Sequence, residues 1–390
     1  MTAFRPDDER ALADVIAAAL AREEPLELVA GGSKRGLGRP LQLPHVLDLS
    51  AFAGIRSYEP EELVLTAGAA TPLASIEAAL AEKRQMLAFE PPDWRALWGS
   101  GDREQTIGGM IAGNLAGPRR IRQGAARDHF LGFRGVSGRA EPFKAGGRVV
   151  KNVTGYDLPK LMAGSHGTLA ALTEVTVKVL PAPEATRTLA ITGLDARAAQ
   201  RAMSAALNAP HEVSGAAHLP GEPGTLLRLE GPAPSVEARA AALKQELAAF
   251  GAVAVLDDAA SAVLWRAVRD LAPFLPHPER ALWRVSVPPT AGPELVARVA
   301  RQHDALHLLD WGGGLVWLAV KDAADGGAAA IRGALTQGGH ATLIRAPDAL
   351  RAAVPVFEPQ PPALAAIAAR VKDGFDPRRI LNRGRMYREL

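Results

Sequence analysis

Cysteine is absent from this chain of 390 residues. Without thiols the chain can form no disulfide, no zinc site built on thiolates and no iron–sulfur cluster from its own side chains. Electron transfer through such a cluster would therefore need a second polypeptide.

Long apolar runs are also missing. No window offers the roughly twenty consecutive apolar residues that span a bilayer, and the N-terminal stretch MTAFRPDDERALADVIAAALARE is acidic and amphipathic rather than a signal peptide. We expect a soluble, cytoplasmic protein. Peripheral attachment to the inner face of the cell membrane, through a complex, stays open as an alternative.

A strong charge of one sign is not present either, because 45 Lys and Arg against 42 Asp and Glu leave a net charge of +3. No basic stripe with interleaved aromatic residues occurs, so nucleic-acid binding is not expected. The tail Lys372–Arg388 comes nearest, but it also carries Asp373 and Asp376, which indicates a mixed surface or a subunit contact.

The composition is that of a globular protein, with 48% hydrophobic and 22% charged residues, and the length favours two domains. Apolar spacing predicts a helix over residues 12–20. Short strands are expected at 26–30, 45–49 and 63–67, and a further helix begins near Pro72. This alternation is typical of an α+β or α/β fold.

Residues 85–147 are rich in Gly, Pro and Arg with little periodicity, which indicates a long functional loop. After Pro181-Ala182-Pro183, strands and helices alternate in two rounds that predict an antiparallel, ferredoxin-like sheet with helices on one face. We therefore divide the chain into residues 1–182, 183–365 and 366–390, and expect the last segment to return to the first.

The first glycine-rich loop, Gly31–Gly38, follows a predicted strand directly. Successive backbone N–H groups in such a loop can hold a pyrophosphate. The loop contains neither the Gly-Lys-Ser/Thr order of a Walker motif nor the G-x-G-x-x-G dinucleotide fingerprint, which disfavours a Rossmann NAD domain. A simple glycine-rich hairpin is the alternative.

The second loop, Thr106–Arg120, places small residues where a helix end could lie against a flat ring system. Arg119 and Arg120 follow and could hold a phosphate, a carboxylate or a reduced flavin anion. Pro91 and Pro92 stiffen the approach to this loop. A tightly packed Gly/Ala helix is the alternative.

The third loop, Gly164–Thr168, is a tight turn that leads into a strand with Val175, Val177 and Val179 on one face. Together the three loops resemble the FAD-binding superfamily of vanillyl-alcohol oxidase or p-cresol methylhydroxylase type. Within it the chain is most similar to the FAD-binding subunits of bacterial glycolate oxidases. The resemblance covers residues 25–182, with a weaker match at Phe375-Asp376-Pro377 and Asn382-x-Gly384-Arg385.

The resemblance implies an α+β fold, a two-part FAD-binding domain followed by an antiparallel cap domain. It places the FAD pyrophosphate on the first loop, at Gly31, Gly32, Ser33, Lys34 and Gly36. The isoalloxazine and ribityl groups would lie along Pro92, Thr106, Gly108, Gly109, Gly113 and Gly117, and the adenine side near Gly164, Gly167, Thr168 and Val175. Some relatives tether the flavin through a first-loop histidine; Ser33 stands there in this chain, so we expect non-covalent FAD.

The His-x-Gly-Asp-Gly-Asn-x-His metal motif of self-sufficient hydroxyacid dehydrogenases is missing, so we assign no metal site. We expect His303 and His307 to be packed or surface residues, and the side chain of His166 to point outward. Tyr156 and Lys151 are candidates for supporting roles near the site, with core packing or a surface ion pair as the default for each. We assign no catalytic residue.

The resemblance implies an FAD-binding subunit of a multi-subunit 2-hydroxyacid oxidase or dehydrogenase, acting on glycolate. Its expected partners are a flavoprotein subunit that carries the metal motif and a Cys-rich iron–sulfur subunit. Two alternatives stay open: a non-catalytic flavin-binding scaffold, and a self-sufficient FAD-dependent alcohol oxidase.

Overall fold

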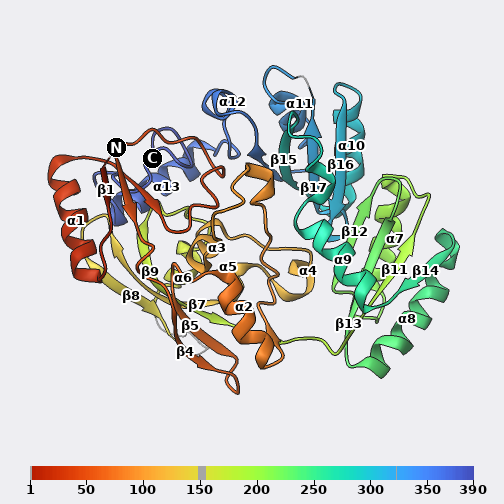
Figure 1. The fold of residues 1–390 in the computed structure, drawn as a ribbon. Helices are drawn as coiled ribbons and strands as arrows, with labels where there is room; N and C mark the ends of the chain where they lie inside the picture. Colours follow the sequence, from red (N-terminus) through yellow and green to blue (C-terminus); the bar gives the residue numbers. More distant parts are fainter. Residues whose placement is uncertain (1, 148–154, 322) are drawn as a thin grey trace.

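The computed structural model describes residues 2–147, 155–321 and 323–390 and has two α/β modules that lie side by side (Figure 1). The N-terminal module holds a parallel sheet in the order β1-β3-β2 and an antiparallel sheet in the order β4-β5-β9-β7-β8. The strands of the parallel sheet are β1 (Thr2–Phe4), β2 (Leu26–Val29) and β3 (His45–Asp48). Those of the antiparallel sheet are β4 (Ile55–Glu59), β5 (Val64–Gly68), β7 (Phe130–Ser137), β8 (Pro142–Gly146) and β9 (Ala170–Lys178).

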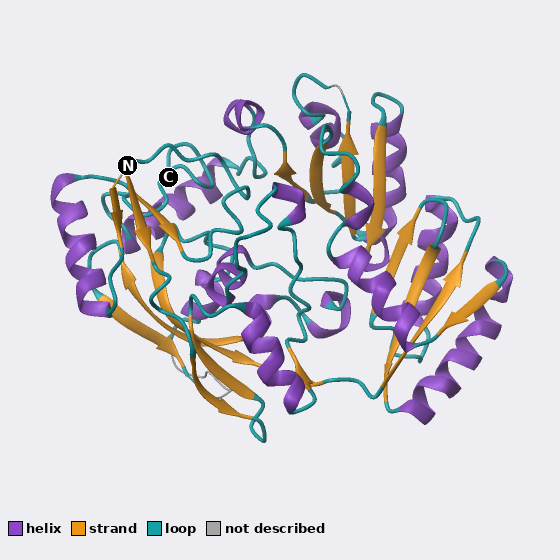
Figure 2. Ribbon diagram, in the orientation of Figure 1, coloured by secondary structure: helices purple, strands orange, loops and turns teal. Residues whose placement is uncertain are grey.

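The helices of this module pack around the two sheets (Figure 2). They are α1 (Glu9–Arg22), α2 (Leu73–Glu82), α3 (Ile107–Gly113), α4 (Arg120–Gln123), α5 (Ala126–His129) and α6 (Leu158–Met162). The short strands β6 (Gln85–Met86) and β10 (Leu180–Pro181) pair with each other where the chain leaves the module.

Residues 85–147 therefore do not form one long loop, and that prediction is wrong. Two glycines of β7 interrupt the alternation of side chains that would identify this strand in the sequence. A Cβ at Gly132 would lie 2.8 Å from the Gly147 nitrogen, and one at Gly135 would lie 2.7 Å from the Ala171 oxygen. Because side chains are excluded at these positions, the apolar alternation that marks a strand is interrupted.

The second module is one antiparallel sheet in the order β14-β11-β13-β12-β16-β17-β15-β18. Each half follows a β-α-β-β-α-β path, so the module is a pair of ferredoxin-like repeats, which confirms the predicted architecture. Its strands are β11 (Ala185–Ile191), β12 (Gly215–Leu219), β13 (Gly224–Gly231), β14 (Val253–Leu256), β15 (Ala281–Ser286), β16 (Ala305–Asp310), β17 (Leu315–Val320) and β18 (His340–Arg345). The pair His218–Leu309 joins the two halves.

The sheet of the second module is buried on both faces. Along β17, Leu315, Trp317 and Ala319 join the core shared with the N-terminal module, whereas Val316, Leu318 and Val320 join a second core. Helices α7 (Ala196–Asn208), α8 (Ala233–Leu247), α10 (Gly292–Ala300) and α11 (Ala328–Gly333) cover that second core. Helix α9 (Asp258–Arg269) packs on the opposite face, so the expectation that all helices lie on one face is wrong.

After α12 (Asp348–Ala353) and α13 (Pro362–Phe375), the C-terminal segment lies beside β2. Leu381 forms a parallel bridge with Leu26, and the Leu28 amide donates to the Asn382 side chain at 2.8 Å. Lys372, Asp376 and Arg385 are buried. The tail is therefore packed into the N-terminal module through these buried residues, whereas Arg378, Arg383 and Arg388 are exposed. The predicted subunit contact stays a prediction.

Candidate functional site

A cavity of about 150 Å³ opens in the N-terminal module. Its walls come from the end of β2 and the loop after it, from α3, from the turn before β9, and from Asn382 and Arg385 of the C-terminal segment. Three glycine-rich loops that are far apart in the sequence thus face one space.

Nine of the fifteen predicted cofactor residues line this cavity: Gly31, Gly32, Ser33, Lys34, Thr106, Gly108, Gly109, Gly113 and Gly167. The other six do not line it: Gly36, Pro92, Gly117, Gly164, Thr168 and Val175.

Packing accounts for several of those six. A Cβ at Gly36 would lie 2.5 Å from Cδ1 of Trp98, and one at Gly117 would lie 2.6 Å from the Glu90 oxygen. The Thr168 hydroxyl donates to the Ser165 oxygen at 2.7 Å, and Val175 is wholly buried in β9. Their sequence pattern reflects close packing around the cavity.

Sequence reasoning missed part of the lining. Some of the missed residues lie within the three predicted loops, beside the residues that were named, and the others come from ordinary strand residues and from distant segments. The missed residues are Leu28, Val29, Ala30, Arg35, Leu37, Leu49, Ala69, Ala70, Ala112, Ser165, His166, Ala170, Leu172, Asn382 and Arg385. Only the tail motif Asn382-x-Gly384-Arg385 gave a signal that could have added Asn382 and Arg385 to the site.

Lys34 is a half-buried cation that lines the cavity. Its ammonium group is 3.4 Å from the Ser33 hydroxyl and 3.3 Å from the Gln105 side-chain oxygen, so it makes only long hydrogen bonds to neutral groups. Burial lowers the pKa of Lys34 to about 8. A half-buried ammonium in a loop of backbone N–H groups is chemically suited to an anion such as a pyrophosphate, so the donor set fits FAD.

Arg35 and Arg385 stand on the other side of the same loop and share the carboxylate of Glu27. Arg385 also donates to the Arg35 oxygen at 3.1 Å, which ties the first loop to the C-terminal segment. The two guanidinium groups hold the pKa of Glu27 below its usual range against the effect of burial. These charges are paired within the chain and fix the shape of the loop.

His166 does not point outward as expected. Its ring lies 5.0 Å from the ring of Phe357, and the residue lines the cavity. Burial, with a smaller contribution from Arg385, lowers the pKa of His166 to about 4, so the imidazole is neutral near pH 7. A neutral ring here can pack or accept a hydrogen bond, but it adds no charge.

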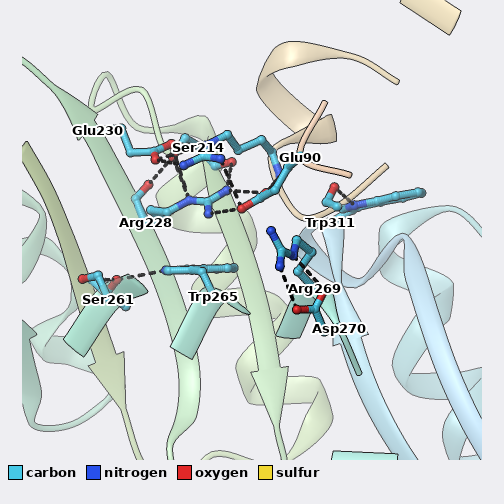
Figure 3. A network of polar contacts seen from close by, with 12 residues as sticks. Glu90, Ser214, Arg228, Glu230, Ser261, Trp265, Arg269, Asp270 and Trp311 are labelled. Carbon is cyan, nitrogen blue, oxygen red and sulfur yellow. Dashed lines mark hydrogen bonds and ion pairs between the residues drawn. The ribbon is translucent and has the colours of Figure 1, made fainter. Parts of the chain in front are cut away.

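Arg119 does not face the cavity. It forms ion pairs with Glu90 at 3.3 Å and Glu230 at 2.6 Å. Figure 3 shows Glu90 and Glu230 in a polar network with Arg228 between the two modules. Arg228 of β13 holds Glu90 from the other side at 2.9 Å and stacks on Trp265. The sequence-based assignment of Arg119 to a ligand anion is therefore wrong, since its charge is already neutralised.

The remaining candidates do not form a site together. Tyr156 is 90% exposed, and Lys151 lies outside the described residues. His307 lies in β16, with its ring 6.5 Å from that of His218. Among residues 2–147, 155–321 and 323–390, no group of three or more His, Asp or Glu side chains is arranged to hold a metal ion.

Residues 2–146 match the family model described as an FAD binding domain. Over 388 residues the chain is 37% identical to the glycolate oxidase subunit GlcE of Escherichia coli (strain K12), which covers 98% of this chain and 99% of the relative. It is 40% identical over 101 residues to the glycolate oxidase subunit GlcD of Bacillus subtilis (strain 168), which covers 26% of this chain and 20% of that relative.

A solved structure of 4-ethylphenol oxidase from Gulosibacter chungangensis has the same fold, with a TM-score of 0.72 and 13% identity over 99% of this chain and 89% of that one. In the described part of the chain, no helix has the length and apolar character needed to cross a membrane.

Proposed function

This chain belongs to the family of the glycolate oxidase subunit GlcE, and from that membership we propose that it is the FAD-binding subunit of a multi-subunit enzyme that oxidises glycolate to glyoxylate. The oxidation removes two electrons and two protons from the CH–OH group of the substrate. The observation that carries the proposal is sequence similarity along the whole chain together with a cavity lined by the three predicted loops.

The first loop holds the pyrophosphate in this proposal. Lys34 supplies the positive charge, and backbone N–H groups of Gly31, Gly32 and Ser33 supply hydrogen bonds. Because position 33 is serine, the FAD is held without a covalent bond. When bound, the FAD supplies a two-electron acceptor.

The partners in this proposal are a flavoprotein subunit that carries a metal motif and a Cys-rich iron–sulfur subunit. The similarity to two proteins that are both named glycolate oxidase subunits supports an assembly of several chains. The lack of cysteine supports placing any iron–sulfur cluster on another chain. Peripheral membrane association would then come through the complex.

The test is the visible flavin spectrum of the purified chain, recorded alone and with its partner subunits, before and after anaerobic addition of glycolate. We expect flavin that stays with the protein, is released by denaturation, and bleaches only when the partners are present. Bleaching of the isolated chain would instead indicate a self-sufficient oxidase. A chain that never takes up flavin, in any preparation, would refute the cofactor assignment.

A Lys34→Gln variant sharpens this test. A hydrogen bond to a charged group contributes about 1.5–3 kcal/mol, so we expect FAD affinity to fall by roughly 10- to 100-fold. Lys83→Gln, at an exposed lysine, removes the same charge elsewhere and is the matched control. Equal FAD affinity in the two variants would contradict the role given to Lys34.

A further inference from the structure

Two arginines from different modules lie over one indole ring. The guanidinium carbon of Arg120, the first residue of α4, is 4.5 Å from the centre of the Trp311 ring. The guanidinium carbon of Arg284, in the middle of β15, is 5.1 Å from the same centre. The Trp311 indole N–H donates to the Gly117 oxygen at 3.3 Å, which fixes the ring to the N-terminal module (Figure 3).

Neither guanidinium forms an ion pair or a hydrogen bond with a carboxylate, although Asp128 acts to raise the pKa of Arg120, and Asp310 that of Arg284, against the larger effect of burial. In the described ranges 2–147, 155–321 and 323–390, no hydrogen bond or ion pair reaches the side chain of Arg120 or Arg284. Arg228 offers a direct comparison, because it also stacks on a tryptophan at 4.5 Å but is held by the carboxylate of Glu90. The pair at Trp311 has the same aromatic support and lacks the carboxylate.

The surroundings of the pair leave it positively charged. Burial and the neighbouring charge of Arg120 lower the pKa of Arg284 to about 10, which still leaves it charged near pH 7. Burial raises the pKa of Asp310 to about 7, and its carboxyl oxygen accepts the Trp311 amide at 2.7 Å. Desolvation lowers the pKa of His340, and the charges of Arg284 and Arg120 lower it further. Two like charges, partly removed from water and close together, are unfavourable until an anion joins them.

We propose that Arg120 and Arg284 form a binding site for a small carboxylate at the junction of the two modules. The planar guanidinium group forms two parallel hydrogen bonds with a carboxylate, and Trp311 holds both groups in place. The choice of a small carboxylate rests on the proposed function, because glycolate and glyoxylate each carry one carboxylate. A ligand here would touch both modules and link the second module to the chemistry of the first.

The test is calorimetric titration of the purified full-length chain with glycolate and with oxalate. We expect Arg120→Gln and Arg284→Gln each to weaken binding by tenfold or more, with unchanged flavin content and thermal midpoint. Arg284→Lys keeps the charge without the paired geometry and should recover part of the affinity. Arg201→Gln, at an exposed arginine of α7, should bind as the unaltered chain does.

Equal affinity in all the variants would overturn the proposal. So would an unaltered chain that binds neither carboxylate, or one that binds phosphate or chloride as tightly. If instead the Arg284→Gln chain loses only its partner subunits while carboxylate affinity is unchanged, the arginines bind a protein carboxylate and the small-molecule site is refuted. Flavin uptake and glycolate-dependent bleaching are read separately, so a failure of the proposed function remains distinguishable from a failure of this site.

Discussion

At the scale of single residues, two lysines show how the environment distinguishes a residue that can bind a ligand from one that stabilises the fold. Lys372 contacts the Asp376 carboxylate at 2.6 Å and the oxygens of Thr168 and Leu381. Lys34 has only long contacts to neutral groups and faces a cavity. A buried charge that is fully paired stabilises the fold, whereas a cation in a cavity that forms no ion pair is available to an anionic ligand.

A histidine in the second module predicts acid sensitivity. His218 is 2% exposed, and its Nδ1 lies 3.0 Å from the Thr225 hydroxyl. Burial, then the nearby His307, lowers the pKa of His218 to about 4. Between pH of about 6.5 and 4 the unfolded chain binds a proton that the folded chain does not, so the free energy of unfolding falls as pH falls, by up to about 1.4 kcal/mol per pH unit.

Urea unfolding at several pH values in this window measures the effect. In a His218→Gln variant the free energy of unfolding should depend less steeply on pH. The decrease in slope should correspond to up to one fewer proton bound on unfolding. His303→Gln, at a partly exposed histidine, is the control and should keep the slope. If His218→Gln has the same slope as the unaltered chain, the buried neutral state of His218 is wrong.

At the scale of elements, a glycine of α3 sets the distance between that helix and the end of β5. The Gly108 amide donates to the Ala69 oxygen at 2.7 Å, and a Cβ at Gly108 would lie 2.8 Å from the Ala69 Cβ. Gly108 and Ala69 both line the cavity. A side chain at position 108 would therefore change both the packing of α3 and the shape of the cavity.

Gly108→Ala should lower the free energy of unfolding by about 1–3 kcal/mol, because the added methyl group displaces α3. FAD content should fall with it, as read from the ratio of flavin to protein absorbance. Gly101→Ala adds the same group where no atom lies within 4 Å of the new Cβ, so it should leave both quantities unchanged. A Gly108→Ala protein as stable and as flavin-loaded as the control would show that α3 tolerates the shift.

Individual strands differ in how well the sequence predicts them. Strands such as β17, with six apolar residues in a row, and the ferredoxin-like order of the second module follow from apolar pattern and turn residues. Strand β7 does not, because Gly132 and Gly135 replace the side chains that would reveal it. The direction of His166 also depends on Phe357, a contact that no local pattern records.

At the scale of the whole molecule, the site depends on pairs that are distant in sequence. Arg385 and Glu27 are 358 residues apart, yet their 3.0 Å contact closes one wall of the cavity. The glycine loops were predictable because each is local, and the tail motif gave a signal for Asn382 and Arg385. The carboxylate pairs of Arg119 were not predictable, because they depend on how the modules come together.

The junction of the modules is held by four buried charges that balance: Glu90, Arg119, Arg228 and Glu230. Glu90 belongs to the N-terminal module and contacts both arginines, Arg119 of its own module and Arg228 of the second. The backbone N–H of Arg119 also donates to the Glu90 carboxylate at 2.8 Å. The two guanidinium groups hold the pKa of Glu90 below its usual range despite burial. Removal of this one carboxylate leaves two cations facing Glu230.

Glu90→Gln should therefore lower the free energy of unfolding by about 3–5 kcal/mol, since it leaves a buried charge without its partner. Adding Arg228→Gln should cost less than the sum of the two single changes, because the second change removes the charge that the first left unpaired. Urea unfolding of the two single variants and the double variant measures this coupling, with Glu61→Gln at an exposed carboxylate as the control. Additive losses, or a Glu90→Gln loss no larger than that of the control, would mean that the junction is held by apolar packing and that its charges contribute nothing to the union of the two modules.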